Sequence, residues 1–221
     1  MEFFNSAASQ YAENTLSVLQ FTSLVDSSSV KFMAFLTSLN QTFNSTWTAE
    51  QVYGRNDPIA NFQGTQRNLS LAWDVPAANI DEAKTNMIRV SKLTKMLYPG
   101  YTQGTIRVKR NPSADALIGE DQTIAVGSNA LSLSKAPLIR LKFANLINDA
   151  TKGGGEGLLG YVGNLNINPT LDMGMFTEKQ KLYPKVYSLS IDFTVLHEHD
   201  LGKTSPAGKL FGDAKSFPYG G

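Results

Sequence analysis

The stretch between residues 65 and 98 constrains the fold most, because a strand pattern there passes directly into a capped helix. Apolar and polar residues alternate over 69–75, the period of a strand with one buried face. Pro76 ends the strand because it has no backbone N–H to donate. Asn79 then stands as the N-cap of a helix predicted over 79–98, with Glu82 placed as in a capping box.

The predicted helix is amphipathic. Apolar residues recur at helical spacing on the face expected to join the core, namely Ile80, Ala83, Met87, Val90 and Leu97. Polar and basic residues are expected mostly on the solvated face, namely Lys84, Asn86, Arg89, Lys92 and Lys95. A single helix in an otherwise strand-like chain is typical of a mainly β fold in which two packed antiparallel sheets carry one flanking α-helix.

Further strand patterns lie on both sides of the helix. Residues 30–39 and 41–47 are β-prone and predict a hairpin or one long bent strand, with Asn40 between them. Residues 137–147 and 159–167 predict a second hairpin, in which Gly163 marks either a bulge or a close backbone approach. Residues 185–196 alternate over their whole length, which predicts a central strand. The apolar side of the 159–167 strand is expected to carry Leu159, Tyr161, Leu165 and Ile167.

We predict one domain over residues 30–200, with an N-terminal arm at 1–29 and an irregular C-terminal tail at 201–221. The arm either packs on its own domain or reaches a neighbouring subunit. Residues 111–136 form a long polar connection, which in a compact domain is usually functional. Residues 168–183 are predicted as a connection anchored by Met173, Met175 and Phe176.

Composition excludes several classes of function. The formal net charge is +1, with 20 basic and 19 acidic residues, so the chain lacks the basic excess of a tight nucleic-acid or membrane-surface binder. The chain has no cysteine, which excludes disulfides and thiolate chemistry. The sequence shows no basic segment followed by an apolar run at its start and no apolar run of about 20 residues, so we expect no secretion signal and no membrane span.

Two motifs have the residue spacing of a functional site but lack the structural context that such a site requires. Alternate histidines at His197 and His199, with Glu198 between them, match the spacing of zinc or nickel ligands, but they lie at a strand end where charged residues are solvated. Residues 155–160 fit the dinucleotide-binding pattern, but a strand follows where a helix is required. We therefore predict that the chain is not an enzyme and has no catalytic residue, cofactor or metal ion.

The segment from Val52 to Tyr101 resembles the baseplate tail-tube initiator proteins of contractile-tailed bacteriophages. Outside this window only the order of elements is similar. The resemblance rests on these residues: Tyr53-Gly54-Arg55, Asp57-Pro58-Ile59, Phe62-Gln63-Gly64-Thr65, Arg67, Ser70-Leu71, Trp73, Val75-Pro76-Ala77, Glu82-Ala83 and Met96-Leu97-Tyr98-Pro99.

The resemblance implies a tail-tube fold assembled as a homo-hexameric ring in the virion baseplate, built in the host cytoplasm. Its expected partners are the baseplate hub or spike protein, an adjacent tube ring, the tape-measure protein, and DNA in unspecific passage. On this interpretation the interface elements are residues 111–136 and 52–66, because they are expected to project from the sheets. The expected interface residues are Tyr53, Arg55, Asp57, Phe62, Gln63 and Arg67.

Alternatives remain open at the level of sequence. A repeating tail-tube or secretion-tube protein would have the same fold but would stack on itself. A carbohydrate-binding β-sandwich would use exposed Trp47, Tyr53 or Tyr101 as stacking platforms. A metal hydrolase built on His197 and His199 comes last.

Overall fold

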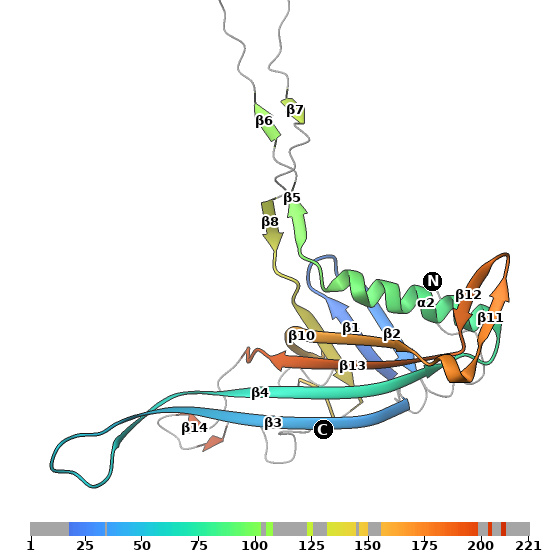
Figure 1. Cartoon of the computed structure of the whole chain (residues 1–221). Coiled ribbons are helices and arrows are strands. Elements are labelled where there is room, and N and C mark those ends of the chain that lie inside the picture. The colour runs from blue at the N-terminus through green and yellow to red at the C-terminus, as the bar shows by residue number, and fades with distance from the viewer. Residues whose placement is uncertain are drawn as a thin grey trace, which may run out of the picture.

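A computed structural model describes residues 18–33, 35–102, 105–107, 123–125, 132–144, 146–149, 156–198, 203–204 and 209–210. In this part the chain is mainly β with one α-helix and a large antiparallel sheet, as the sequence predicted (Figure 1). The large sheet is formed by β1 (Val18–Ser23), β2 (Ser29–Met33), β3 (Phe35–Glu50), β4 (Ile59–Pro76), β9 (Ile139–Phe143), β10 (Leu158–Pro169) and β13 (Val186–Val195). The other described elements are α2 (Ile80–Met96), β5 (Gly100–Thr102), β6 (Thr105–Arg107), β7 (Thr123–Ala125), β8 (Ser132–Lys135), η2 (Leu171–Met173), β11 (Met175–Glu178), β12 (Lys181–Pro184), β14 (Lys203–Thr204) and β15 (Lys209–Leu210).

The seven-stranded sheet has the order β2-β1-β9-β10-β13-β4-β3 and folds over on itself. In a flat sheet β1 and β4 would lie four strand spacings apart, roughly 19 Å. Instead the rings of Phe21 on β1 and Trp73 on β4 are 5.7 Å apart, and Phe32 on β2 is 5.9 Å from Trp73. The sheet therefore forms two facing leaves, which we call the three-strand leaf (β2-β1-β9) and the four-strand leaf (β10-β13-β4-β3).

The core lies between these leaves and against α2. It is one cluster of buried apolar side chains that includes Trp73, which is 0% exposed, and the inward residues of β13. α2 contributes Val90, Leu93 and Met96 to the same cluster. Burying this many large side chains is the main driving force for folding.

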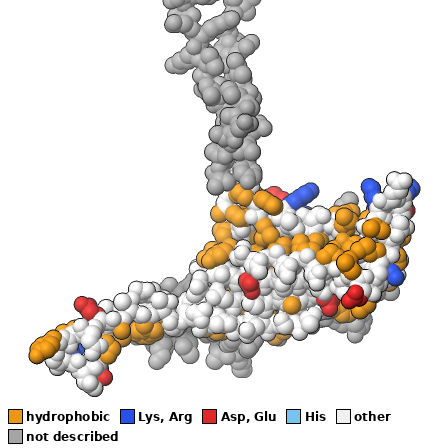
Figure 2. Space-filling model, viewed as in Figure 1, with side chains coloured by type: hydrophobic (Ala, Val, Ile, Leu, Met, Phe, Trp, Pro, Cys, Tyr) orange, Lys and Arg blue, Asp and Glu red, His pale blue; other side chains and the backbone are white. Residues whose placement is uncertain are grey.

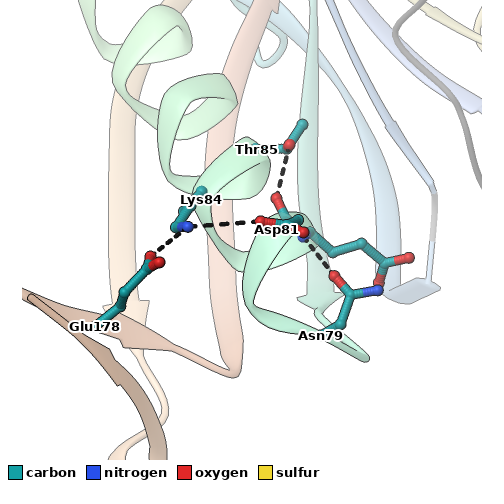
Figure 3. A network of polar contacts seen from close by, with 6 residues as sticks. Asn79, Asp81, Lys84, Thr85 and Glu178 are labelled. Carbon is teal, nitrogen blue, oxygen red and sulfur yellow. Dashed lines mark hydrogen bonds and ion pairs between the residues drawn. The ribbon is translucent and has the colours of Figure 1, made fainter.

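α2 begins as the sequence predicted. Asn79 Oδ1 accepts the backbone N–H of Glu82 at 2.8 Å, and the Glu82 carboxylate accepts the N–H of Ala78 at 2.9 Å. Lys84, one turn into the helix, bridges Asp81 on α2 and Glu178 on β11 (Figure 3). The hydrogen bond to Glu178 raises the pKa of Lys84. This bridge ties the β11–β12 ribbon to the start of the helix.

The face of α2 that contacts the core differs from the predicted one. Asn86 and Arg89, which were expected in solvent, are buried, whereas Met87 is exposed. Asn86 Nδ2 donates to the carbonyl of Pro76 at 3.1 Å, and Asn86 Oδ1 accepts a hydrogen bond from Arg89 Nη1 at 3.3 Å. The buried amide nitrogen and amide oxygen of Asn86 are therefore both hydrogen-bonded. Burial lowers the pKa of Arg89. The inward side of α2 also buries Val90 and Leu93 in the core, and the hydrogen bond from Asn86 to the end of β4 satisfies its amide there.

One expectation about the first fifty residues needs correction. Residues 18–23, assigned to an arm at 1–29, form β1, which pairs with β2 and β9 and buries Leu19 and Phe21. Of the two alternatives predicted around Asn40, a hairpin or one long strand, the structure has a strand, because β3 continues through Asn40 and is 16 residues long. β2 and β3 are consecutive in the sequence but form opposite borders of the sheet.

At the start of β10 the side chains face the opposite way from the predicted one. Leu158 is buried and Tyr161 is exposed, whereas Leu165 and Ile167 face inward as predicted. The change occurs at a register shift between Val162 and Asn164, the bulge predicted at Gly163. β13 is central, as predicted, with β10 on one side and β4 on the other.

Three segments predicted to lie outside the strands contain strands. Residues 59–64, part of the segment 52–66 that was expected to project from the sheets, are the start of β4. Residues 132–135, expected in the connection 111–136, form β8, which pairs with β5, while β7 pairs with β6. Residues 175–184 form the β11–β12 ribbon, and Met173, predicted as an anchor, is exposed. The remainder of residues 111–136, residues 1–17, His199 and most of the tail at 201–221 lie outside the described residues.

Candidate assembly site

β3 and β4 continue past the sheet as a projecting hairpin. β13 pairs with β4 only as far as Asn68, whereas β3 and β4 pair with each other out to Glu50 and Ile59. We call residues 43–67 the distal hairpin. It leaves the body of the molecule by roughly 25 Å at about 3.3 Å per residue, and Figure 1 shows it extending at the left.

The inward side of the distal hairpin carries an exposed aromatic pair beyond the polar pair Ser45 and Thr65. Trp47 and Phe62 are cross-strand partners with ring centroids 5.0 Å apart, and they remain 58% and 55% exposed. Trp47 lies on the face that carries Leu39 within the body, because strand residues two apart share a face. Phe62 is an odd number of residues from Leu71 but pairs with Trp47 on the same face, because the register shifts between Thr46 and Trp47. Hydrophobic side chains are visible along the hairpin in Figure 2. The face that packs the core inside the body is thus uncovered outside it.

The opposite side of the hairpin is polar and continues the outer face of the four-strand leaf. Ser70 Oγ donates to Asp192 at 2.8 Å and Ser188 Oγ donates to Asp74 at 2.6 Å across neighbouring strands. We call this the polar face. In the described residues it carries carboxylates but no lysine or arginine. Four aligned positions illustrate its character: Asn164, Asp192, Ser70 and Asn40.

The six predicted interface residues all lie in this hairpin but in three environments. Tyr53, Arg55 and Asp57 are exposed in the tip loop between β3 and β4, where the Arg55 N–H donates to Val52. Phe62 and Gln63 lie on β4, and Gln63 donates to Thr48 of the polar face. Trp47, the partner of Phe62, was missed as an interface residue, although its alternation with Phe43 and Ser45 indicated a shared face.

Arg67, the sixth predicted residue, lies at the root of the hairpin rather than on its surface. It is 2% exposed, its Nη2 donates to Gln41 Oε1 at 2.7 Å, and its guanidinium is 5.6 Å from the Phe43 ring centroid. A charge-assisted hydrogen bond and a cation–π contact therefore hold the two strands where they leave the body.

Two borders of the four-strand leaf are open among the described strands. β3 pairs only with β4, and β9 covers only residues 158–160 of β10, which leaves residues 161–169 open on that side. The border of the three-strand leaf at β2 is different, because Lys92 of α2 donates to the carbonyl of Ser29 at 3.0 Å. An open border presents unpaired N–H and C=O groups and can pair with another strand.

The residues considered for metal chemistry form a different arrangement. Glu198 accepts both Nη atoms of Arg140 at 2.8 Å, and this hydrogen bonding raises the pKa of Arg140. Glu156 also contacts Arg140, at 3.3 Å. Exposed His197 is next to this cluster in sequence, and within the described ranges no three His, Asp or Glu side chains could hold a metal ion. Glu198 therefore anchors the chain after β13.

The carbohydrate alternative stays a prediction. Trp47 and Tyr53, two of its three expected stacking platforms, are exposed in the distal hairpin, and the Trp47 ring is inclined at 59° to that of Phe62. Within the described part of the chain, no helix has the length and apolar character to cross a bilayer.

No family model and no curated protein matches the sequence of this chain.

Proposed function

We propose that the chain is a structural subunit of a bacteriophage baseplate and tail tube, a homo-hexameric ring that starts the tube on the central hub. The observation that carries the proposal is the pair of open borders on one leaf, β3 and residues 161–169 of β10. The proposal of six copies and of a place in the virion comes from the resemblance of residues 52–101 to tube initiators.

The direction of the strands supports ring closure. The leaf has four strands that alternate in direction, so β3 and β10 run in opposite senses. β3 of one copy can therefore pair antiparallel with β10 of the next, and the same junction can be repeated around a ring. Such head-to-tail contacts give closed rings when the rotation between copies closes. Lys92 opposes the same growth at β2, because it occupies a border carbonyl.

The polar face supports a role as the wall of a DNA channel. Each phosphate that a protein neutralises adds affinity, which would hold DNA during passage. The polar face has Asp74 and Asp192 but, in the described residues, no cation. Its serine, threonine and asparagine side chains would remain hydrated. In the proposed ring this face lines the bore and the three-strand leaf lies outside it.

The first test is the assembly state of the recombinant full-length chain at high concentration. Negative-stain imaging and native mass spectrometry are expected to show a six-fold ring. A monomer at every concentration contradicts the proposal.

A second measurement asks which strands form the contact. Hydrogen exchange of the assembled sample is expected to show new protection in residues 35–42 and 161–169 relative to a diluted, dissociated sample, with little change in β2. A ring without that protection would show that another surface closes it.

A further inference from the structure

α2 has an apolar stripe on the side that faces away from the core. Met87, Ile88 and Tyr98, the last just beyond the C-cap of the helix, are 44%, 67% and 62% exposed. At about 100° per residue, positions 87, 88, 91, 95 and 98 fall within about 100° of one another around the helix axis, so they share one face. We call these five positions the outer face of α2. Figure 2 shows hydrophobic side chains over the part of the body where Figure 1 places this helix.

The surroundings of the outer face are mainly positive. Lys92 and Lys95 lie on this half of α2, which has no Asp or Glu. The elements beside it add Lys31 on β2, Lys135 on β8 and one acid, Asp26 in the β1–β2 turn, whose carboxylate already accepts a backbone N–H. A ligand of net negative charge is therefore favoured here.

The other acidic groups beside α2 are concentrated at the start of the helix. Asp81 and Glu178 both contact Lys84 there, and Glu82 completes the capping box. Lys95 lies roughly 20 Å further along the axis than Asp81, at about 1.5 Å per residue. This separation exceeds the Debye length of about 8 Å at physiological ionic strength, so these acids do not cancel the charge of Lys95.

We propose that residues 1–17 of the same chain bind the outer face of α2. The aromatic and charged side chains of this segment are Phe3, Phe4, Tyr11, Glu2 and Glu13. The segment has no lysine or arginine, so it brings apolar rings to the stripe and two negative charges to its basic surroundings. Three exposed apolar side chains on one helical face exceed the scattered exposure that needs no partner.

The opposite end of the sequence does not have the matching chemistry. Residues 199–221 contain three lysines and two aspartates, which is a side-chain charge of +1 with histidine neutral. A segment of net positive charge is repelled by basic surroundings, whereas residues 1–17 are attracted. Of the two end segments, charge therefore selects residues 1–17 as the occupant.

The point of attachment makes the contact intramolecular. β1 begins at Val18, directly after the segment, and pairs with β2, whose Ser29 carbonyl is bound by Lys92 of α2. Seventeen extended residues span up to about 56 Å, and a helix of 17 residues is about 25 Å long, so the segment can lie along α2. A short flexible tether gives a local concentration in the millimolar range, so even a contact of modest affinity is occupied.

The contact would place the segment on the side of the molecule opposite the polar face. α2 packs against the core, which is on the inward side of the four-strand leaf, whereas the polar face is the outer side of that leaf. In the proposed ring, residues 1–17 would therefore lie outside the bore. The inference itself concerns a single copy and does not depend on the ring.

The test is intramolecular cross-linking in the full-length chain, which has no native cysteine. The double variant Ser9→Cys/Ser91→Cys is treated with a short bismaleimide at low protein concentration, where links between copies are rare. An internal link is expected, detected by intact mass and by the linked peptide pair. The matched control is Ser9→Cys/Thr42→Cys, because Thr42 is exposed and shares the polar face with Asn40. An internal link no more frequent than in the control overturns the inference.

A mixing experiment identifies the copy that supplies the segment. Ser9→Cys copies are mixed with Ser91→Cys copies and cross-linked in the same way. Few links between copies are expected, because each outer face is occupied by its own segment. Links between copies that outnumber the internal links of the double variant would show that a second copy is the occupant, which overturns the inference.

Surface variants test the chemistry of the contact. Ile88→Glu and Lys95→Glu, introduced separately into the Ser9→Cys/Ser91→Cys chain, each change an exposed residue of the outer face. Both are expected to reduce the internal link toward the control level, the first through lost apolar contact and the second through charge repulsion. Urea denaturation checks that each variant is folded. An unchanged yield in either folded variant contradicts the proposed contact.

This inference and the proposed function fail separately. Six-fold rings whose copies lack the internal link would reject the inference and leave the ring in place. An internal link in a chain that stays monomeric at every concentration would support the inference and reject the ring.

Discussion

The part of the β3–β4 hairpin inside the body and the distal hairpin have the same alternating pattern but opposite environments. The chain has two tryptophans, and they lie one in each part: Trp73 is 0% exposed and Trp47 is 58% exposed. Both share a strand face with apolar neighbours. Trp73 is buried because Phe21 and Phe32 of the other leaf pack on it, whereas no described segment faces Trp47. Alternation therefore creates an apolar face, and distant segments decide whether that face becomes core or interface.

The largest expected effect comes from truncating the two tryptophans separately. Trp73→Ala is expected to lower the free energy of unfolding by about 3–5 kcal/mol, because it leaves a cavity between the leaves. Trp47→Ala is expected to lower it by about 1 kcal/mol or less, because the Trp47 ring contacts Phe62 across the strands but is otherwise largely exposed. Urea denaturation of the unassembled chain measures both values. Similar losses in the two variants would mean that Trp47 is also packed in the monomer.

Two glycines provide a second comparison of the body with the distal hairpin. A Cβ on Gly160 would lie 2.1 Å from the Thr194 carbonyl oxygen and 2.7 Å from Phe193, whereas a Cβ on Gly64 would have no atom within 4 Å. Gly160→Ala is expected to lower the free energy of unfolding by about 1–3 kcal/mol. Gly64→Ala is expected to stay within about 0.5 kcal/mol of wild type. Thermal denaturation of the two variants measures the difference. Equal melting temperatures would contradict the expected difference between Gly160 and Gly64.

Arg67 tests where the boundary between the two parts lies. Arg67→Met keeps most of the side-chain stem but removes the hydrogen bond to Gln41, at an expected cost of about 1.5–3 kcal/mol. Hydrogen exchange is expected to become faster in residues 43–67 and to remain unchanged in β13. Faster exchange throughout the sheet would show that Arg67 supports the body rather than the root of the hairpin.

The smallest expected effect concerns the turn between β1 and β2. The Ser28 N–H donates to Asp26 Oδ1 at 3.1 Å and lowers the pKa of Asp26 below its ordinary value. A lowered carboxyl pKa stabilises the fold above the unfolded-state value of 3.8, and this stabilisation disappears as the pH falls through the folded-state pKa. Asp26→Ala is expected to cost about 0.3 kcal/mol at pH 7, since the side chain is exposed.

The pH series for Asp26→Ala has a matched control in the other hairpin. Asp57→Ala changes an exposed carboxylate in the tip loop and is expected to leave the free energy of unfolding at pH 7 unchanged. Urea denaturation measures both variants, and for Asp26→Ala it is repeated as the pH is lowered. A difference between Asp26→Ala and wild type that does not shrink as the pH falls below 3.8 would contradict the assigned hydrogen bond.

Local patterns were sufficient wherever one segment determines its own structure. Asn79 caps α2 because its side chain reaches the Glu82 N–H within the same turn. The alternation over residues 185–196 predicted the one buried side of β13, which alternates along most of the strand. Local patterns were insufficient where a segment far away in the sequence determines whether a side chain is buried. Asn86 is buried because the Pro76 carbonyl lies beside it, and helical periodicity in a polar residue gives no sign of such a partner.

The sequence by itself determined where α2 begins, that the chain is mainly β, and which residues of the regular strands such as β13 share a face, because side-chain spacing and capping act over a few residues. The tertiary structure decided that β2 and β3 lie at opposite borders, that Arg67 is buried, and that the face carrying Trp47 and Phe62 is left open. These features depend on contacts between segments far apart in the chain. A period of two residues cannot encode them, because it specifies a face but not what packs against it.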